Sequence, residues 1–157
     1  MQSKEYYMSI ALSEAKIASG KGEVPVGAVV VDESGEIISR GHNLRESTFD
    51  PTAHAEIVAL REASVHRSAW NLSGCTMYVT LEPCVMCSGA IVNARIDKLY
   101  YGALDERYGG TDTLYRIPTD VRLNHRTEVE GGVMRFECRE VLKEFFAGLR
   151  QKSKPPI

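Results

Sequence analysis

The sequence predicts an α/β domain in which helices flank a central, mixed five-stranded sheet in three layers. Helical spacing of apolar residues alternates with β-branched runs, a pattern typical of parallel strands joined by right-handed crossovers. Two strand-like runs near the N-terminus are separated only by turn residues, which predicts a hairpin and makes the sheet mixed. The 157 residues are 43% hydrophobic, enough for one core, so we expect a single domain over 1–157.

The first elements are a helix and a hairpin. Apolar residues recur at helical intervals over 4–19, with Ser3 available as an N-cap and Gly20 as a stop. The hairpin pairs 26–31 with 36–41 around the turn sequence DESG.

A second helix is expected to begin near residue 50. Asp50 precedes Pro51, which is typical of an N-cap followed by proline at the first helical position. This start would place His54 and Glu56 in the first turns of the helix.

The second half alternates strand and helix. The segment 76–81 reads as a strand, and Pro83 opens a helix after it. Further strands are expected at 98–102 and 127–129, before a last helix at about 133–151. The direction of the last strand is left open by the sequence.

The charge is small but unevenly distributed. Nineteen Lys and Arg residues against 21 Asp and Glu residues give a net charge of −2, which argues against a strongly basic nucleic-acid binder. From residue 139 onward, however, only two residues are acidic and five are basic, namely Arg139, Lys143, Arg150, Lys152 and Lys154. This segment is either a polyanion contact or the solvated face of a helix.

The sequence also bears on location. The longest apolar run, 24–31, is far shorter than the ~18 residues that a membrane-spanning helix needs. The N-terminus, MQSKEYY, has no apolar secretory segment. We therefore expect a cytoplasmic protein without membrane contact.

The four cysteines fall into two groups. Cys84 and Cys87 form a C-x-x-C pair, which by itself fits a metal site, a redox pair or two small core residues. Cys75 and Cys138 have no such spacing and read as buried small hydrophobic residues.

His54 makes a metal site the favoured interpretation of the C-x-x-C pair. The segment with His54 and the segment with Cys84 and Cys87 are both predicted to begin helices, at the same end of the sheet. One imidazole and two thiolates bind Zn²⁺ with an open fourth position, as in catalytic zinc sites. Glu56 follows His54 by two residues and is free to carry protons to and from a reacting group. The combination H-x-E with P-C-x-x-C is the signature of zinc nucleobase deaminases.

Further blocks extend this resemblance. EVPVGA at 23–28, DPTAHAE at 50–56, LEPCVMC at 81–87 and NHR at 124–126 are similar to successive blocks of bacterial tRNA-specific adenosine deaminases. KEFF at 143–146 resembles the C-terminal helix of that family, so the match covers about residues 5–150. The resemblance implies a cytidine-deaminase-like fold, a homodimer, one Zn²⁺ per chain, and conversion of adenosine to inosine at the wobble position of a tRNA anticodon arm.

The resemblance also implies roles for individual residues. Glu56 would be the proton shuttle, and Asn43 and the backbone at Ala55 would hold the flipped base. The zinc ligands would be His54, Cys84 and Cys87.

Other substrate contacts are less directly indicated. Val26 could form an apolar wall for the base, or simply belong to the sheet core. Phe146 could stack on a nucleotide, although one of the two adjacent phenylalanines is expected in the core. Asp105 lies in a loop that borders the nucleotide groove in the family. That loop departs from the family pattern, with Leu104 in place of an Arg and Asp112 in place of a Gly.

Two other functions stay open. A free nucleobase or nucleoside deaminase of the same fold, acting on guanine or cytosine, is favoured by the altered 104–113 loop and disfavoured by the NHR block and the basic C-terminal segment. A zinc-stabilised RNA-binding module without catalysis is disfavoured by Glu56, because a purely structural site needs no carboxylate beside an open metal position.

Overall fold

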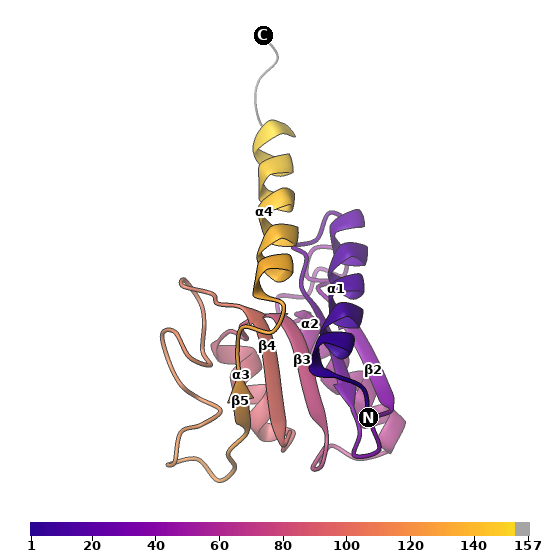
Figure 1. Ribbon diagram of the computed structural model, residues 1–157, viewed down its shortest axis with the longest axis vertical. Coiled ribbons are helices and arrows are strands. Elements are labelled where there is room, and N and C mark those ends of the chain that lie inside the picture. Colours follow the sequence, from indigo (N-terminus) through magenta and orange to yellow (C-terminus); the bar gives the residue numbers. More distant parts are fainter. Residues whose placement is uncertain (153–157) are drawn as a thin grey trace.

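The computed structural model describes residues 1–152, which form nine helices and strands. Figure 1 shows their arrangement. In chain order they are α1 (Lys4–Gly20), β1 (Gly27–Val31), β2 (Ile37–His42), α2 (Ala55–Arg67), β3 (Thr76–Leu81), α3 (Val85–Asn93), β4 (Lys98–Ala103), β5 (Glu128–Glu130) and α4 (Arg135–Lys152).

The five strands form one mixed sheet in the order β2-β1-β3-β4-β5. β1 pairs antiparallel with both β2 and β3. β3 and β4 are parallel, and β5 adds to β4 in parallel as well. The predicted hairpin and mixed sheet are therefore confirmed, and the last strand runs parallel to its neighbour.

Helices cover both faces of the sheet and give the predicted three layers. On one face, α1 and the start of α4 enclose a core that includes Tyr7, Met8 and Cys138. On the other face, α2 and α3 pack over a core that includes Leu60, Ile91 and Met77. Cys75 and Cys138 are both fully buried, as the sequence predicted.

The first helix is capped as predicted, whereas the second begins later than expected. The Ser3 hydroxyl accepts a hydrogen bond from the Tyr6 N–H at the start of α1. Asp50 instead accepts hydrogen bonds from the N–H and hydroxyl of Thr52, which closes a separate turn. The chain then stays extended through His54, and α2 starts at Ala55. The prediction of a helix from Asp50 was wrong because this local turn satisfies the same aspartate.

The last helix starts two residues later than the predicted residue 133 and rises beyond the sheet (Figure 1). The residues just before it are attached at the end of β4, where the N–H groups of Gly132 and Val133 donate to the carbonyl oxygens of Gly102 and Tyr101. Within α4 only Cys138 is fully buried. Lys154, one of the five basic residues, lies outside the described residues.

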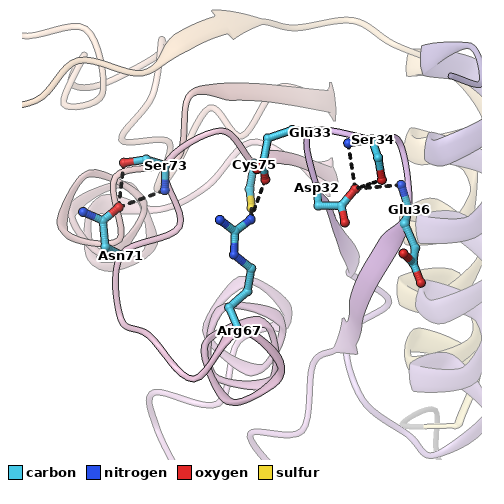
Figure 2. A network of polar contacts seen from close by, with 8 residues as sticks. All are labelled: Asp32, Glu33, Ser34, Glu36, Arg67, Asn71, Ser73 and Cys75. Carbon is cyan, nitrogen blue, oxygen red and sulfur yellow. Dashed lines mark hydrogen bonds and ion pairs between the residues drawn. The ribbon is translucent and has the colours of Figure 1, made fainter.

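A polar network ties elements together at the end of the sheet where β3 begins (Figure 2). Arg67 at the end of α2 forms an ion pair with Glu33 and contacts the Cys75 sulfur at 3.1 Å. Asp32 closes the β1–β2 turn by accepting hydrogen bonds from the N–H groups of Ser34 and Glu36. None of the helices in residues 1–152 is long and apolar enough to cross a membrane.

Candidate functional site

Two helix starts meet at the end of the sheet opposite this network. His54 is the N-cap of α2, and Cys84 is the N-cap of α3, with Cys87 in the first turn of that helix. Neither N-cap side chain caps its own helix, so both remain available to other groups. The structure thus brings the three predicted zinc ligands together.

The geometry of these three side chains fits a zinc ion. The His54 Nδ1 atom lies 3.6 Å from the sulfur of Cys84 and 3.6 Å from that of Cys87. All three ligand atoms lie within 4.8 Å of one another. A tetrahedral zinc ion at about 2.3 Å from sulfur and about 2.0–2.1 Å from nitrogen would place nitrogen and sulfur roughly 3.5 Å apart. The donor set and its spacing therefore match Zn²⁺.

The two thiols interact directly. Hydrogen bonds from the Cys87 thiol and from His54 lower the pKa of Cys84 to about 4. The pKa of Cys87 is raised, because its proton is held by Cys84 and because the thiol is buried. One thiolate is thus already favoured at neutral pH, and a metal ion would displace the shared second proton.

Glu56 lies in the first turn of α2 beside these groups and is 4% exposed. Burial raises the pKa of its carboxyl group to about 7, with a further contribution from Cys84. The side chain also interacts with the Cys87 thiol. A carboxyl group with this pKa can both accept and donate a proton near neutral pH.

Close packing between β2 and α2 fixes where His54 and Glu56 lie. A Cβ atom at Gly41 would lie 2.6 Å from the Ala55 carbonyl oxygen and 2.8 Å from the Ala59 nitrogen. Only glycine allows this approach, which sets the start of α2 against the end of β2.

The structure places three of the predicted substrate-contacting residues at the same end of the sheet. Asn43 directly follows β2; its side-chain NH₂ donates to the Val24 carbonyl oxygen and its Oδ1 accepts from the Arg45 N–H. Ala55 is the first residue of α2, where a backbone N–H has no partner within the helix. Val26 is 9% exposed and packs in the core between the sheet and α2.

The other two lie on the loop after β4 and on α4. Asp105 accepts hydrogen bonds from the N–H groups of Arg107 and Tyr108, at the start of the loop after β4. Phe146 is 42% exposed in the second half of α4, which projects beyond the sheet (Figure 1). The structure does not bring Phe146 to the metal ligands.

Sequence reasoning gave no role to two buried carboxylates that flank the site. Glu23 is fully buried and accepts hydrogen bonds from the N–H groups of Glu46 and Ser47, in the segment after Asn43. Glu82 is 2% exposed and binds the loop after β4. The one signal in the sequence was that Glu82 lies between a strand and Pro83-Cys84, where a charged side chain needs a special partner.

Comparisons with known proteins agree with this geometry. The cytidine and deoxycytidylate deaminase zinc-binding region matches residues 1–103. The chain is 46% identical over 154 residues to a tRNA-specific adenosine deaminase of Streptococcus pyogenes, covering 98% of this chain and 96% of that protein. It is 50% identical to one of Aquifex aeolicus, covering 94% and 96%.

Solved structures show the same fold. One, from a study of A-to-I editing by tRNA:A34 deaminases at the wobble position of transfer RNA, has a TM-score of 0.84 and 41% identity, covering 87% of this chain and 99% of that one. Guanine deaminase from Nitrosomonas europaea has a TM-score of 0.83, covering 94% and 86%, but only 24% identity. The second likeness therefore concerns the fold alone.

Proposed function

The chain belongs to the cytidine and deoxycytidylate deaminase zinc-binding family, and on this premise we propose that it deaminates adenosine to inosine at the wobble position of a tRNA anticodon. The observation that carries the proposal is the buried Glu56 beside the His54, Cys84 and Cys87 cluster. Near full-length identity of 46–50% to tRNA-specific adenosine deaminases selects the substrate.

The reaction replaces an amine by an oxygen atom. A bond forms between a water oxygen and C6 of adenine, and the bond from C6 to the exocyclic nitrogen breaks, which releases ammonia. Protons must leave the water and reach the ring nitrogen and the departing amine. Glu56 carries these protons, since its carboxyl group is next to the ligands and is not one of them.

His54, Cys84 and Cys87 would hold the zinc ion. When bound, zinc supplies a Lewis acid that lowers the pKa of a water molecule to near neutrality. The burial of Cys87 and Glu56 keeps bulk water away from the reacting groups and strengthens the electrostatic interactions between them.

Asn43 and Ala55 would recognise the flipped base. An amide side chain has two N–H donors and two acceptor lone pairs. Within the described residues, Val24 and Arg45 take one of each, so one donor and one acceptor remain for the base. The Ala55 N–H, at the first position of α2, provides a further donor. Val26 packs in the core and would support the side of the base pocket that Asn43 and Ala55 form.

The RNA would extend from the site toward α4 and the loop after β4. α4 leaves the end of β4, which is the end of the sheet that carries the site. Lys143 and Lys152 are exposed on this helix, and Phe146 offers an exposed ring for stacking. Asp105 begins the loop that follows β4 beside the Cys84 turn.

The family resemblance also supports a homodimer in the cytoplasm. Large apolar side chains are exposed on and after α2, including Val65 at 79% and Trp70 at 65%, and a second copy would cover such residues. Sedimentation at micromolar concentration should give twice the 17.4 kDa mass of one chain. A single monomeric species would contradict the dimer.

One assay tests the function against its alternatives. The purified protein is incubated with a transcribed tRNA anticodon arm that has adenosine at the wobble position, and inosine is measured. Ammonia release from free guanine, cytosine and adenosine is measured in parallel. We expect inosine in the RNA and little ammonia from free bases. Efficient release from guanine or cytosine without inosine formation would favour the nucleobase deaminase, and no turnover at all would favour an RNA-binding module.

A further inference from the structure

Glu82 is a buried carboxylate that the chemistry above does not use. It directly follows β3 and precedes Pro83 and Cys84, and it is 2% exposed. None of the ion pairs found within residues 1–152 involves it. Burial of a carboxylate is costly unless hydrogen bonds replace its hydration. The groups that donate hydrogen bonds to Glu82 therefore indicate what this side chain does in the fold.

All of these partners belong to the loop after β4. The Asp105 N–H donates to Oε1 at 3.1 Å, and the Thr113 hydroxyl donates to the same oxygen. The N–H groups of Asp112 and Thr113 donate to Oε2 at 2.8 and 2.9 Å, with that of Thr111 at 3.3 Å. One carboxylate therefore holds both ends of segment 105–113 at the start of this loop. These hydrogen bonds outweigh the effect of burial and lower the pKa of Glu82.

Gly109 and Gly110, in the middle of segment 105–113, pack against the turn formed by residues 83–85, which we call the Cys84 turn. Gly109 pairs with Cys84 in an isolated antiparallel bridge, and the Gly110 N–H donates to the Pro83 carbonyl oxygen at 2.8 Å. A Cβ atom at Gly110 would lie 2.8 Å from the Val85 nitrogen. The loop thus contacts the residue that carries a metal-ligand thiol.

A second anchor uses the side chain of Asp112, whose backbone N–H binds Glu82. The Tyr101 hydroxyl donates to the Asp112 carboxylate at 2.6 Å. Between the anchored residues, Tyr108 remains exposed, at 66%, and Leu104, just before them, is 45% exposed.

We propose that Glu82 is a positioning residue for substrate: by holding loop 105–113 against the Cys84 turn, it fixes one wall of the site, on which the RNA next to the target adenosine is seated. This inference rests on the proposed tRNA deamination. A loop that is already ordered costs no conformational entropy when substrate binds, whereas a loosened loop must be ordered at that moment. Within residues 1–152, the hydrogen bonds of the Glu82 side chain all go to segment 105–113 and none to His54, Cys84 or Cys87.

The test is Glu82→Gln, with Asp32→Asn as the matched control. The Gln side chain has nearly the same shape as Glu, but its NH₂ group cannot accept the hydrogen bonds that one carboxylate oxygen accepts from the loop. Asp32 also accepts hydrogen bonds from two backbone N–H groups and a hydroxyl. It follows β1 near the start of β3, whereas Glu82 follows the end of β3, so the two carboxylates lie at opposite ends of the sheet. We expect E82Q to raise KM for the anticodon arm roughly tenfold while kcat stays within about threefold. D32N should leave both unchanged.

Two further readouts separate positioning from a general loss of structure. Zinc content of E82Q should stay at one per chain. Amide hydrogen exchange should become faster at Asp112 and Thr113, and should not change in β4. If E82Q does not fold, Tyr101→Phe removes only the second anchor and should give a smaller rise in KM with faster exchange at Asp112.

Each contrary result overturns the inference in a distinct way. An unchanged KM with faster loop exchange would show that the loop does not seat substrate. Unchanged loop exchange would show that Glu82 does not hold the loop, and loss of zinc would show that it acts through the metal ligands. A wild-type protein that is inactive on the anticodon arm would instead contradict the proposed function, while the exchange measurement still tests the anchoring.

Discussion

At the scale of single residues, Glu56 is the side chain to which we assign the proton transfers. We expect Glu56→Ala to lower kcat by about 10²–10⁴-fold, the usual loss when a general acid and base is removed. Zinc content and the thermal midpoint should change little, because Glu56 is not a ligand. Glu62→Ala, an exposed carboxylate on the same helix, serves as the control. A near-normal turnover of E56A would remove Glu56 from the mechanism.

The metal ligands give a second prediction at this scale. Purified protein should contain about one zinc per chain, and Cys84→Ser should lose it, because a hydroxyl is a far poorer zinc ligand than a thiolate. Cys138→Ser is the matched control, since this thiol lies in the other core, 3.9 Å from the Val133 carbonyl oxygen. Elemental analysis after dialysis distinguishes the two variants. Full zinc retention in a Cys84→Ser, Cys87→Ser double variant would contradict the assignment.

At the scale of elements, the contact of β2 with α2 sets the site geometry. Gly41→Ala would place a methyl group against the α2 backbone, so we expect a destabilisation of about 1–3 kcal/mol from overpacking. The variant should also bind zinc more weakly, because His54 moves with the start of α2. Denaturant unfolding and zinc titration measure the two effects.

Gly148→Ala is the control for this prediction. Nothing lies within 4 Å of a Cβ atom there, and alanine favours a helix over glycine by up to about 1 kcal/mol. Its stability should be equal to or above that of the wild type. If G41A matched G148A in both measurements, the packing of β2 on α2 would not control the site.

α4 gives a second prediction for an element. If Lys143 and Lys152 contact phosphates, replacing both with Ala should raise KM for the anticodon arm and make the plot of log binding constant against log salt shallower by roughly 0.7–0.9 per lost contact. Lys16→Ala, an exposed lysine on α1, should leave the slope unchanged. Identical slopes for the α4 variant and the wild type would place the RNA elsewhere.

At the scale of the whole molecule, two buried carboxylates predict acid sensitivity. Glu23 and Glu82 both have a pKa below the usual 4.5 in the folded chain, because hydrogen bonds outweigh burial. The unfolded chain therefore binds protons more readily at these two carboxylates. Their contribution to the free energy of unfolding is fully present above pH 4.5 and is lost as the pH falls through their pKa values in the folded chain. We expect the contribution of these two carboxylates to the thermal midpoint to hold steady from pH 7 to about 5 and then to drop.

Glu23→Gln tests the origin of this loss. The variant should be less stable at pH 7 and show a smaller decrease in midpoint toward pH 3, since one of the two titrating groups is gone. Calorimetry at several pH values measures both. Parallel curves for the variant and the wild type would mean that Glu23 does not contribute.

The sequence by itself determined the features that depend on local chemistry. Apolar spacing and the Ser3 cap predicted α1, and β-branched runs predicted the strands. Residue type and spacing predicted that His54, Cys84 and Cys87 would come together, because zinc requires particular ligands, and that Glu56 would lie beside them. The helix start at Asp50 was wrong because a turn to Thr52 competes locally for the same side chain.

Only the tertiary structure decided what depends on distant partners. The parallel direction of β5, the hydrogen-bond partners of Glu82 and the projection of α4 beyond the sheet (Figure 1) leave no local trace in the sequence. The donors to Glu82 lie 23 to 31 residues further along the chain. A carboxylate is costly to bury unless folding brings such donors to it, so its role appears only when the loop has been placed beside Cys84.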